Sequence, residues 1–194
     1  YHEHFSYLSL HIVRKIFEDA GLRIWNVEEL SIHGGSLRIF GCHEDDSRET
    51  LEIVEVLMIE ERQRGLQNID TYLNFQKKAD KVKNNFLEFL INQKKSKKIV
   101  AAYGAAAKGN TLLNYAGVKQ DLLPFVCDAA IAKQNKYLPG SHIPIISPSE
   151  LTKIMLDYLL ILPWNIAEEV KSQNAALTKK GTKFVTVVPE LQIV

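Results

Sequence analysis

The stretch that decides the fold is KIVAAYGAAAKGNTLLNY, residues 98–115. It begins with an apolar run typical of a strand covered on both faces, turns at glycines and continues into a helical pattern. Similar apolar runs follow at residues 122–128, 157–164 and 183–189. Helices are predicted between them, over residues 110–117, 147–155 and 165–176. Strands that alternate with helices form right-handed βαβ units, so an α/β fold with a mainly parallel, Rossmann-like sheet is predicted for residues 98–194.

The first 44 residues show a different order of elements. Residues from Ser9 to Ala20 have helical spacing and stop before Gly21, where glycine can take the left-handed closing conformation. Residues 22–31 and 36–43 alternate as strands do and are separated by glycines, which predicts an antiparallel hairpin. One helix and one hairpin cannot bury a sufficient core alone, so this segment must pack against another part of the protein.

Between these parts lies a strongly amphipathic stretch, residues 47–95, which is predicted to form two helices broken near Gly65. We therefore expect three parts: a helix and hairpin over 1–44, a helical connector over 45–97 and the sheet domain over 98–194.

Composition excludes several classes of protein. The chain has 194 residues with 24 Lys and Arg against 23 Asp and Glu, a formal net charge of +1. Nucleic-acid and anionic-membrane binders need a surplus of cations, and a membrane helix needs an apolar run of about 18 residues, so neither is expected. No signal peptide opens the chain, and a cytoplasmic location is expected. Because the sequence begins at Tyr1, we expect a fragment or a processed piece.

The two cysteines, Cys42 and Cys127, are far apart and lack CxxC spacing. Neither a zinc site nor a disulfide framework is indicated, so no metal is expected and both residues are predicted to be buried free thiols.

The turn from Gly104 to Thr111 is a candidate phosphate-binding loop, because glycines at a strand-to-helix turn let backbone amides approach a phosphate. A P-loop would need Lys after the second glycine, but Lys108 precedes Gly109, and a dinucleotide fingerprint would need glycine where Ala106 stands. Asp128 follows 19 residues after Gly109, about where an acidic residue holds a ribose. A nicotinamide-cofactor site and a plain tight turn with a capping Asp128 are equally compatible with these spacings.

A second candidate is the loop of residues 135–144, NKYLPGSHIP. Loops at the carboxyl ends of parallel strands bind ligands in such sheets, so Lys136, Tyr137 and His142 could face the crevice. A surface turn is the alternative. Trp164 follows the third apolar run and belongs either to the same edge or to the core.

The densest titratable cluster opens the chain, as Tyr1-His2-Glu3-His4. Two histidines without a third ligand are weak evidence for a metal. Acid–base chemistry suits the cluster better, because His exchanges a proton near neutral pH while Glu can orient it. A solvated terminus is the alternative.

Five motifs occur in one order along the chain: YHEHFSYLS (1–9), HGGSLR (33–38), AAYGAAAKGNTLLNY (101–115), KYLPGSHIPI (136–145) and LILPWN (160–165). Through them the chain resembles the sugar C-methyltransferase family over nearly its whole length. Members are S-adenosylmethionine-dependent enzymes that methylate a carbon of nucleotide-linked 4-keto deoxysugars. They have an N-terminal zinc-binding module, a central methyltransferase domain and a C-terminal Rossmann-like domain.

The resemblance implies that residues 1–44 end the methyltransferase domain and that the rest is the C-terminal domain. The zinc-binding cysteines and the glycine-rich methyl-donor loop of the family do not occur in this chain. The resemblance therefore implies that S-adenosylmethionine is bound by a missing part, and that the missing zinc-binding and SAM-binding domains are partners. This chain alone is expected to bind no cofactor and to be inactive.

The resemblance also assigns roles to residues. His4 would be the general base, Glu3 would tune or orient it, and Tyr1 would donate a hydrogen bond near the sugar. Further contacts to the nucleotide sugar are implied at His33, Ser36, Gly104, Lys108, Gly109, Asn110, Lys136 and Tyr137. Two alternatives stay open: a nucleotide- or NAD(P)-binding Rossmann module, and a non-catalytic scaffolding domain.

Overall fold

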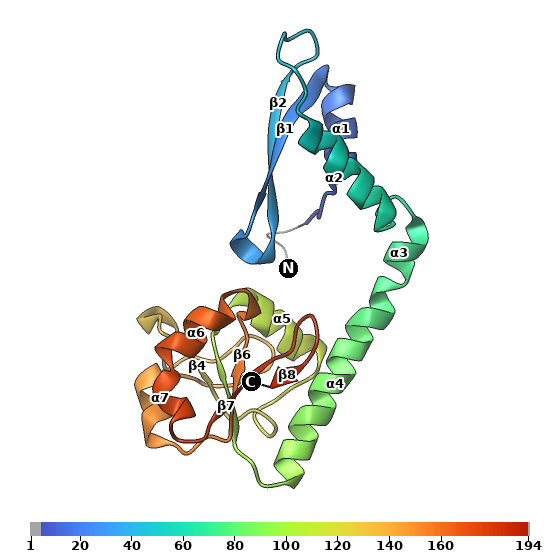
Figure 1. Ribbon diagram of the computed structural model, residues 1–194. Helices are drawn as coiled ribbons and strands as arrows, with labels where there is room; N and C mark the ends of the chain where they lie inside the picture. Colours follow the sequence, from blue (N-terminus) through green and yellow to red (C-terminus); the bar gives the residue numbers. More distant parts are fainter. Residues whose placement is uncertain (1–4, 194) are drawn as a thin grey trace. The chain divides into compact units, whose positions relative to one another are not determined.

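The computed structural model describes residues 5–193 and, within that range, all side chains except those of His33 and Thr152. The described residues form two compact units, one up to Gln76 and one from Lys77 onward (Figure 1). Each unit has its own hydrophobic core and is described by itself. No helix in the described range is both long and apolar enough to cross a membrane.

The first unit combines two helices with a β-hairpin. Its main elements are α1 (Leu10–Asp19), β1 (Leu22–Leu30), η1 (Ile32–Gly34), β2 (Ser36–His43) and α2 (Glu52–Gln63). The two strands pair antiparallel, starting with Leu22 opposite His43, and the register shifts between Ile24 and Asn26. The core consists of six buried side chains, Leu10, Ile24, Val27, Val54, Leu57 and Met58. The predicted helix over 9–20 and the predicted hairpin are confirmed.

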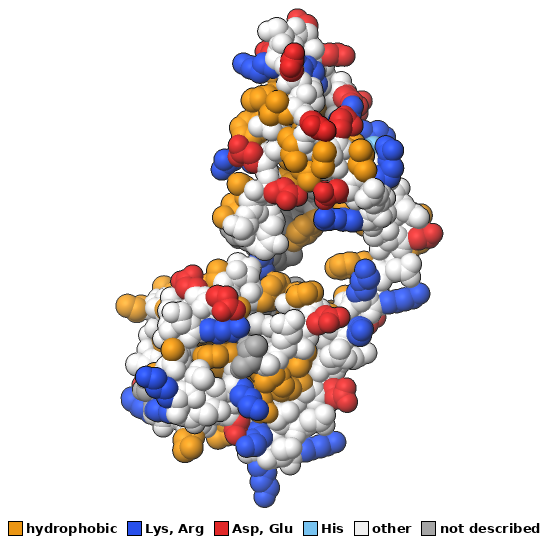
Figure 2. All heavy atoms as spheres, viewed as in Figure 1, with side chains coloured by type: hydrophobic (Ala, Val, Ile, Leu, Met, Phe, Trp, Pro, Cys, Tyr) orange, Lys and Arg blue, Asp and Glu red, His pale blue; other side chains and the backbone are white. Residues whose placement is uncertain are grey.

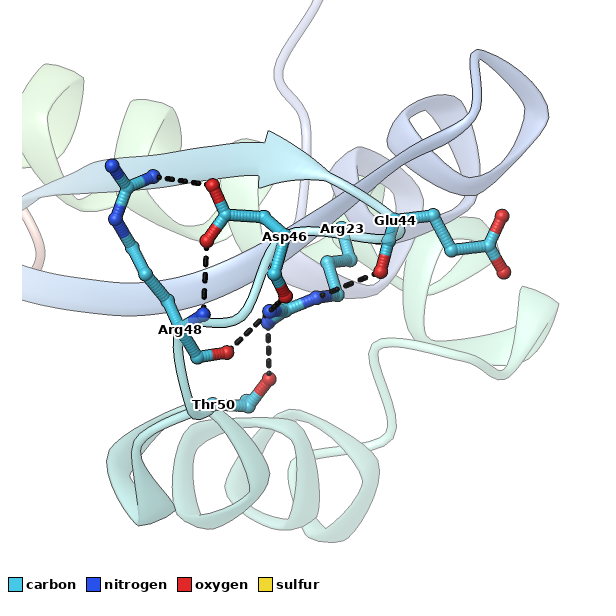
Figure 3. Close-up of polar contacts among 5 residues, drawn as sticks. All are labelled: Arg23, Glu44, Asp46, Arg48 and Thr50. Carbon is cyan, nitrogen blue, oxygen red and sulfur yellow. Dashed lines mark hydrogen bonds and ion pairs between the residues drawn. The ribbon is translucent and has the colours of Figure 1, made fainter.

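Arg23 of β1 holds the segment that leads from β2 into α2 (Figure 3). Its guanidinium donates to the carbonyl oxygens of Glu44 (3.3 Å), Asp46 (2.7 Å) and Arg48, and to Oγ1 of Thr50 (3.0 Å). A planar guanidinium offers five donors in a fixed fork, so one side chain satisfies several carbonyls of a turn that has no regular backbone pairing.

Two more helices follow α2, namely α3 (Ile69–Leu73) and α4 (Phe75–Lys95). The predicted break near Gly65 is confirmed, since Gly65 takes φ +76° just after α2 ends. The prediction of two helices over 47–95 is wrong, because the part after the break is divided again at Asn74, the C-cap of α3. α2 packs in the core of the first unit, whereas Phe86, Phe89 and Leu90 of α4 pack in a core of the second. The assignment of residues 1–44 and 45–97 to separate domains stays a prediction.

The second unit is built on a six-stranded sheet with the order β5-β4-β3-β6-β7-β8. All neighbours are parallel except β7 and β8, which are antiparallel. The strands are β3 (Val100–Tyr103), β4 (Val126–Cys127), β5 (Ile145–Ile146), β6 (Tyr158–Ile161), β7 (Lys183–Thr186) and β8 (Gln192–Ile193). This strand order is the Rossmann-like α/β arrangement predicted from the alternating pattern.

Helical segments cover both faces of this sheet (Figure 1). They are α5 (Ala107–Tyr115), η2 (Ile131–Lys133), η3 (Pro148–Lys153), η4 (Trp164–Ile166), α6 (Ala167–Gln173) and α7 (Ala175–Thr178). One face packs Val100 and Ala102 with α4 and α5, and the other packs Ala101 and Tyr103 with side chains of η3, α6 and α7. Successive residues of β3 thus enter opposite cores, which explains the continuous apolar run.

Several element boundaries differ from the prediction. The segment predicted as a helix over 147–155 is the 3-10 helix η3, in which Ser147 caps a first turn that contains Pro148. The helix predicted over 165–176 is split at Asn174, whose side-chain amide donates to the carbonyl of Val170 at 2.8 Å. β5 and β8 have two residues each, too few to show a sequence period.

Candidate functional site

The carboxyl edge of the sheet contains the topological switch at which open α/β sheets bind ligands. β3 has β4 on one side and β6 on the other. The turn of residues 104–106 after β3 and the Leu162–Pro163 segment after β6 therefore lie at the same edge, on either side of this switch.

Two glycines allow these segments to pack closely. Gly104 has φ +95°, and a Cβ atom there would lie 2.5 Å from Cδ of Pro163. A Cβ atom on Gly109, in α5, would lie 2.6 Å from Cβ of Leu162. Both glycines are thus required by packing alone, independently of any ligand.

The first turn of α5 presents hydrogen-bond donors at this edge. Its N-cap residue, Ala106, makes no side-chain capping bond, and the turn contains no acidic residue. The amides that start the helix carry its positive end. Nζ of Lys108 lies 5.9 Å from the centroid of the Trp164 ring, a cation–π contact. This arrangement can receive an anionic group such as a phosphate.

Asn110 adds an unsatisfied acceptor to the same turn. Its Oδ1 atom is buried and, among the described residues, has no hydrogen-bond partner. Buried polar atoms are normally paired, so a donor from a bound molecule would complete this contact.

Asp128 directly follows β4, and its carboxylate is used within the chain. Oδ2 accepts from the amide of Ala105 at 2.7 Å and from Nζ of Lys133 at 3.1 Å, and Oδ1 accepts from the amide of Ala130 at 2.8 Å. A cofactor ribose would have to compete with these three contacts. They support the interpretation of Asp128 as a turn residue and weaken that of a nicotinamide site.

The loop expected to face the crevice lies elsewhere in the sheet. The amide of Ile145 donates to the carbonyl of Lys136 at 2.8 Å, and Tyr137 forms an isolated antiparallel bridge with Pro144. This segment therefore runs beside β5, with β5 and β4 between it and β3. Neighbouring strands of a sheet lie about 4.8 Å apart. Because β5 and β4 lie between them, Lys136 and Tyr137 are not brought together with the Gly104 turn. The tip of the loop packs on the carboxyl-terminal half of α5, where Nδ2 of Asn114 donates to the carbonyl of Pro139 at 3.0 Å.

Both cysteines are buried free thiols, as predicted. Burial raises the pKa of the Cys127 thiol to about 12, and its Sγ donates to the carbonyl of Ala102 at 3.3 Å. Cys127 is therefore a thiol near neutral pH and not a nucleophilic thiolate.

The first unit has a cavity of about 510 Å³ between the start of α1, the hairpin and α2. Leu8, Leu10, Ser36 and Glu61 are among the residues that line it. The structure thus brings Ser36 close to the segment that follows the YHEH motif. Tyr1, Glu3 and His4 lie outside the described residues, and so does the side chain of His33.

A model of the family described as "C-methyltransferase C-terminal domain" matches residues 31–189 of the chain. The chain belongs to this C-methyltransferase family. The matched region begins after β1 and includes the second strand of the hairpin, the helical stretch and the sheet up to the segment that precedes β8.

The chain is similar to two further known proteins. It is 34% identical over 194 residues to the C-methyltransferase NovU of Streptomyces niveus, a match that covers 100% of this chain and 46% of that protein. The chain thus spans about half the length of this curated relative. A solved structure of UDP-D-quinovosamine 4-dehydrogenase from Vibrio fischeri is 22% identical and has a TM-score of 0.39. The alignment with this structure covers 50% of this chain and 93% of the dehydrogenase chain. Its TM-score is too low to support a conclusion about fold or function.

Sequence reasoning missed Glu61, which binds the start of α1 and lines the cavity of the C-methyltransferase chain. No local motif could have identified it, because its partners lie 50 and 51 residues away in the sequence. The only local signal is its place one helical turn after the buried Leu57.

Proposed function

We propose that the chain is the C-terminal portion of an S-adenosylmethionine-dependent enzyme that methylates a carbon of a nucleotide-linked 4-keto deoxysugar. The observation that carries this proposal is the family match over residues 31–189. It is supported by the order of the five motifs quoted above and by the relative from Streptomyces niveus. S-adenosylmethionine would be bound by residues of the longer protein outside this chain.

The proposed chemistry assigns the acid–base step to the N-terminal motif. His4 removes the proton α to the ketone, Glu3 tunes or orients this base, and Tyr1 donates a hydrogen bond near the sugar. The electron pair of the broken C–H bond forms an enolate, and its nucleophilic carbon is the position that would be methylated. The proton stays on His4 until it is returned to solvent. The donor, when bound, supplies only the electrophilic methyl group.

We propose that the second unit contributes contacts to the nucleotide part of the substrate. The first turn of α5 offers amides and Lys108 to a diphosphate, and Asn110 offers its unpaired acceptor to a donor on the ligand. Lys108 and Asn110 both belong to this first turn. Lys136 and Tyr137 lie two strands away, so their proposed role is secondary.

We also propose that residues 1–44 complete a sheet of the preceding methyltransferase domain. Among the described residues, β1 and β2 pair only with each other, and a two-stranded sheet is marginally stable alone. Figure 2 shows apolar side chains on the visible face of this unit. Exposed apolar residues in α1 and β2 include Ile12, Ile16 and Leu37. Additional strands and helices would cover such surfaces.

The test of this proposal is the substitution His4→Asn in the intact protein. Asn cannot accept a proton, so exchange of the α proton of the keto sugar with deuterated solvent should fall by at least a hundredfold. NMR of the substrate measures this exchange without requiring methyl transfer. His43→Asn, at the exposed end of β2, is the matched control and should leave exchange unchanged. Exchange at the normal rate in the His4→Asn protein would exclude His4 as the base.

A further inference from the structure

The turn after β3 keeps two glycines of the dinucleotide fingerprint G-x-G-x-x-G, and each has a structural reason. In that fingerprint the first glycine forms the tight turn, the second lets the pyrophosphate approach the backbone, and the third lets the helix pack closely. Gly104 has φ +95° and meets the first requirement. Gly109 is buried, and a Cβ atom there would lie 2.6 Å from Cβ of Leu162, so it meets the third.

Ala106 stands at the second position, which is the one that serves the ligand. Its φ of −104° and ψ of 161° lie in the extended region that any residue adopts, so the backbone does not require glycine here. The residue is partly exposed. A pyrophosphate laid against this turn would meet the methyl group that the fingerprint leaves out.

The second position that would serve a dinucleotide is Asp128, whose carboxylate holds the ribose in such sites. Here it accepts from the amides of Ala105 and Ala130 and from Nζ of Lys133. A carboxylate has about four lone-pair sites, so three contacts leave too few for both hydroxyls of a ribose. The two amide contacts close the turns, whereas Lys133 comes from η2 with a side chain that is 43% exposed.

We propose that Ala106 and Lys133 are specificity-determining residues that exclude dinucleotides from this Rossmann-like unit. Ala106 obstructs the pyrophosphate, and Lys133 occupies the carboxylate that would hold the ribose. A dinucleotide spans the switch between β4 and β6, whereas a diphosphate that ends at Lys108 need not cross Ala106. The unit thus keeps the glycines that build the fold and has lost the two features that bind the cofactor.

The experiment restores both features in the 194-residue chain, with Ala106→Gly, Lys133→Ala and the two combined. Isothermal titration calorimetry with NAD and with NADP measures binding. Both substitutions are compatible with folding, because glycine is a better N-cap residue than alanine and Lys133 contributes one partly exposed ion pair. Thermal melts establish that each variant is folded before titration.

We expect no measurable binding of NAD or NADP by the unchanged chain at about 1 mM ligand. The combined variant should bind NAD with a Kd at least about tenfold lower than that of the unchanged chain, because the approach to the turn and the ribose acceptor are both free. Each single variant should gain less, since one obstacle remains.

The choice between the two cofactors reports whether the ribose contacts Asp128. A carboxylate accepts from the ribose hydroxyls of NAD but repels the 2′-phosphate of NADP, so the combined variant should prefer NAD by about tenfold or more. Ala107→Gly, at the exposed residue next to Ala106, and Lys153→Ala, which breaks an exposed pair with Glu150, form the matched control. This control variant should gain no binding.

Several results would overturn the proposal. Saturable binding of either cofactor by the unchanged chain is one, and a folded combined variant that gains no affinity for NAD is another. An equal gain in the control variant, or a gain without preference for NAD over NADP, would equally exclude the roles assigned to Ala106 and Lys133. These titrations use neither the sugar nucleotide nor the methyl donor, so failure of the proposed function would leave their outcome unaffected.

Discussion

Gly104 shows how a single position can satisfy two requirements at once. Its φ of +95° lies in a region that side chains with Cβ rarely adopt, and a Cβ atom would approach Cδ of Pro163 to 2.5 Å. The sequence motif was compatible with a phosphate loop or a tight turn. The contact with Pro163 shows that packing requires the glycine in either case.

The substitution Gly104→Ala tests this packing. It should lower the free energy of unfolding of the second unit by about 1–3 kcal/mol more than Gly181→Ala, because of overpacking against Pro163. Gly181 is the matched control, since it has φ +91° and no described atom lies within 4 Å of the position that a Cβ atom would take. Urea unfolding followed by circular dichroism measures both values. Equal losses in the two variants would mean that the β6 loop moves aside at no cost.

At the scale of elements, β3 and β6 are joined at the edge where they begin. Oδ2 of Asp157 accepts from the amide of Ile99 at 2.8 Å, and Oδ1 pairs with Nζ of Lys98 at 2.7 Å. The hydrogen bond from Lys98 and that from Ile99 lower the pKa of Asp157 below its ordinary value of 3.8. The side chain thus aligns the two central strands before their regular pairing starts.

This pKa shift predicts a dependence of stability on pH. Because the folded-state pKa of Asp157 is lowered, its contribution is present above pH 3.8 and is lost as pH falls through the folded-state value. The protein should therefore be more stable than Asp157→Asn at pH 7, and the difference should shrink below pH 3.8. Asp121→Asn, which breaks an exposed pair with Lys94, serves as the control. Thermal melts at several pH values measure this difference in stability. A difference that stays constant from pH 7 to pH 2 would contradict the assignment of the effect to the Asp157 carboxylate.

At the scale of the whole molecule, the near-neutral net charge conceals an uneven distribution. Residues 77–194 contain 17 Lys and no Arg against 9 Asp and Glu, whereas most of the acidic residues precede Lys77. Figure 2 shows Lys side chains on the visible face of the second unit. The balance of positive and negative residues argues against a polyanion partner for the chain as a whole. It does not describe the second unit, whose excess of Lys favours anionic ligands such as nucleotide diphosphates.

Because the two units do not share a hydrophobic core, residues 77–194 are predicted to fold without the first unit. Both cores of the sheet consist of residues after Lys77, including Phe86 and Phe89 of α4. This fragment should melt cooperatively, and deoxythymidine diphosphate at a hundredfold excess over its dissociation constant should stabilise it by about 2.7 kcal/mol. NAD is the control and should leave the melting temperature unchanged, because Asp128 is engaged within the chain. Stabilisation by NAD alone would favour the nicotinamide interpretation instead.

The amino-acid pattern alone was sufficient for the α/β class, the hairpin, the break near Gly65 and the family, because periodicity, glycine positions and ordered motifs are local properties of the chain. Only the tertiary structure showed that Asp128 closes a turn, that Lys136 and Tyr137 lie beyond β5, and that Glu61 holds the start of α1. These three facts depend on pairs of residues brought together by strand order and helix packing. A contact across 51 residues leaves no period in the sequence, so its existence follows from the fold and not from the local pattern.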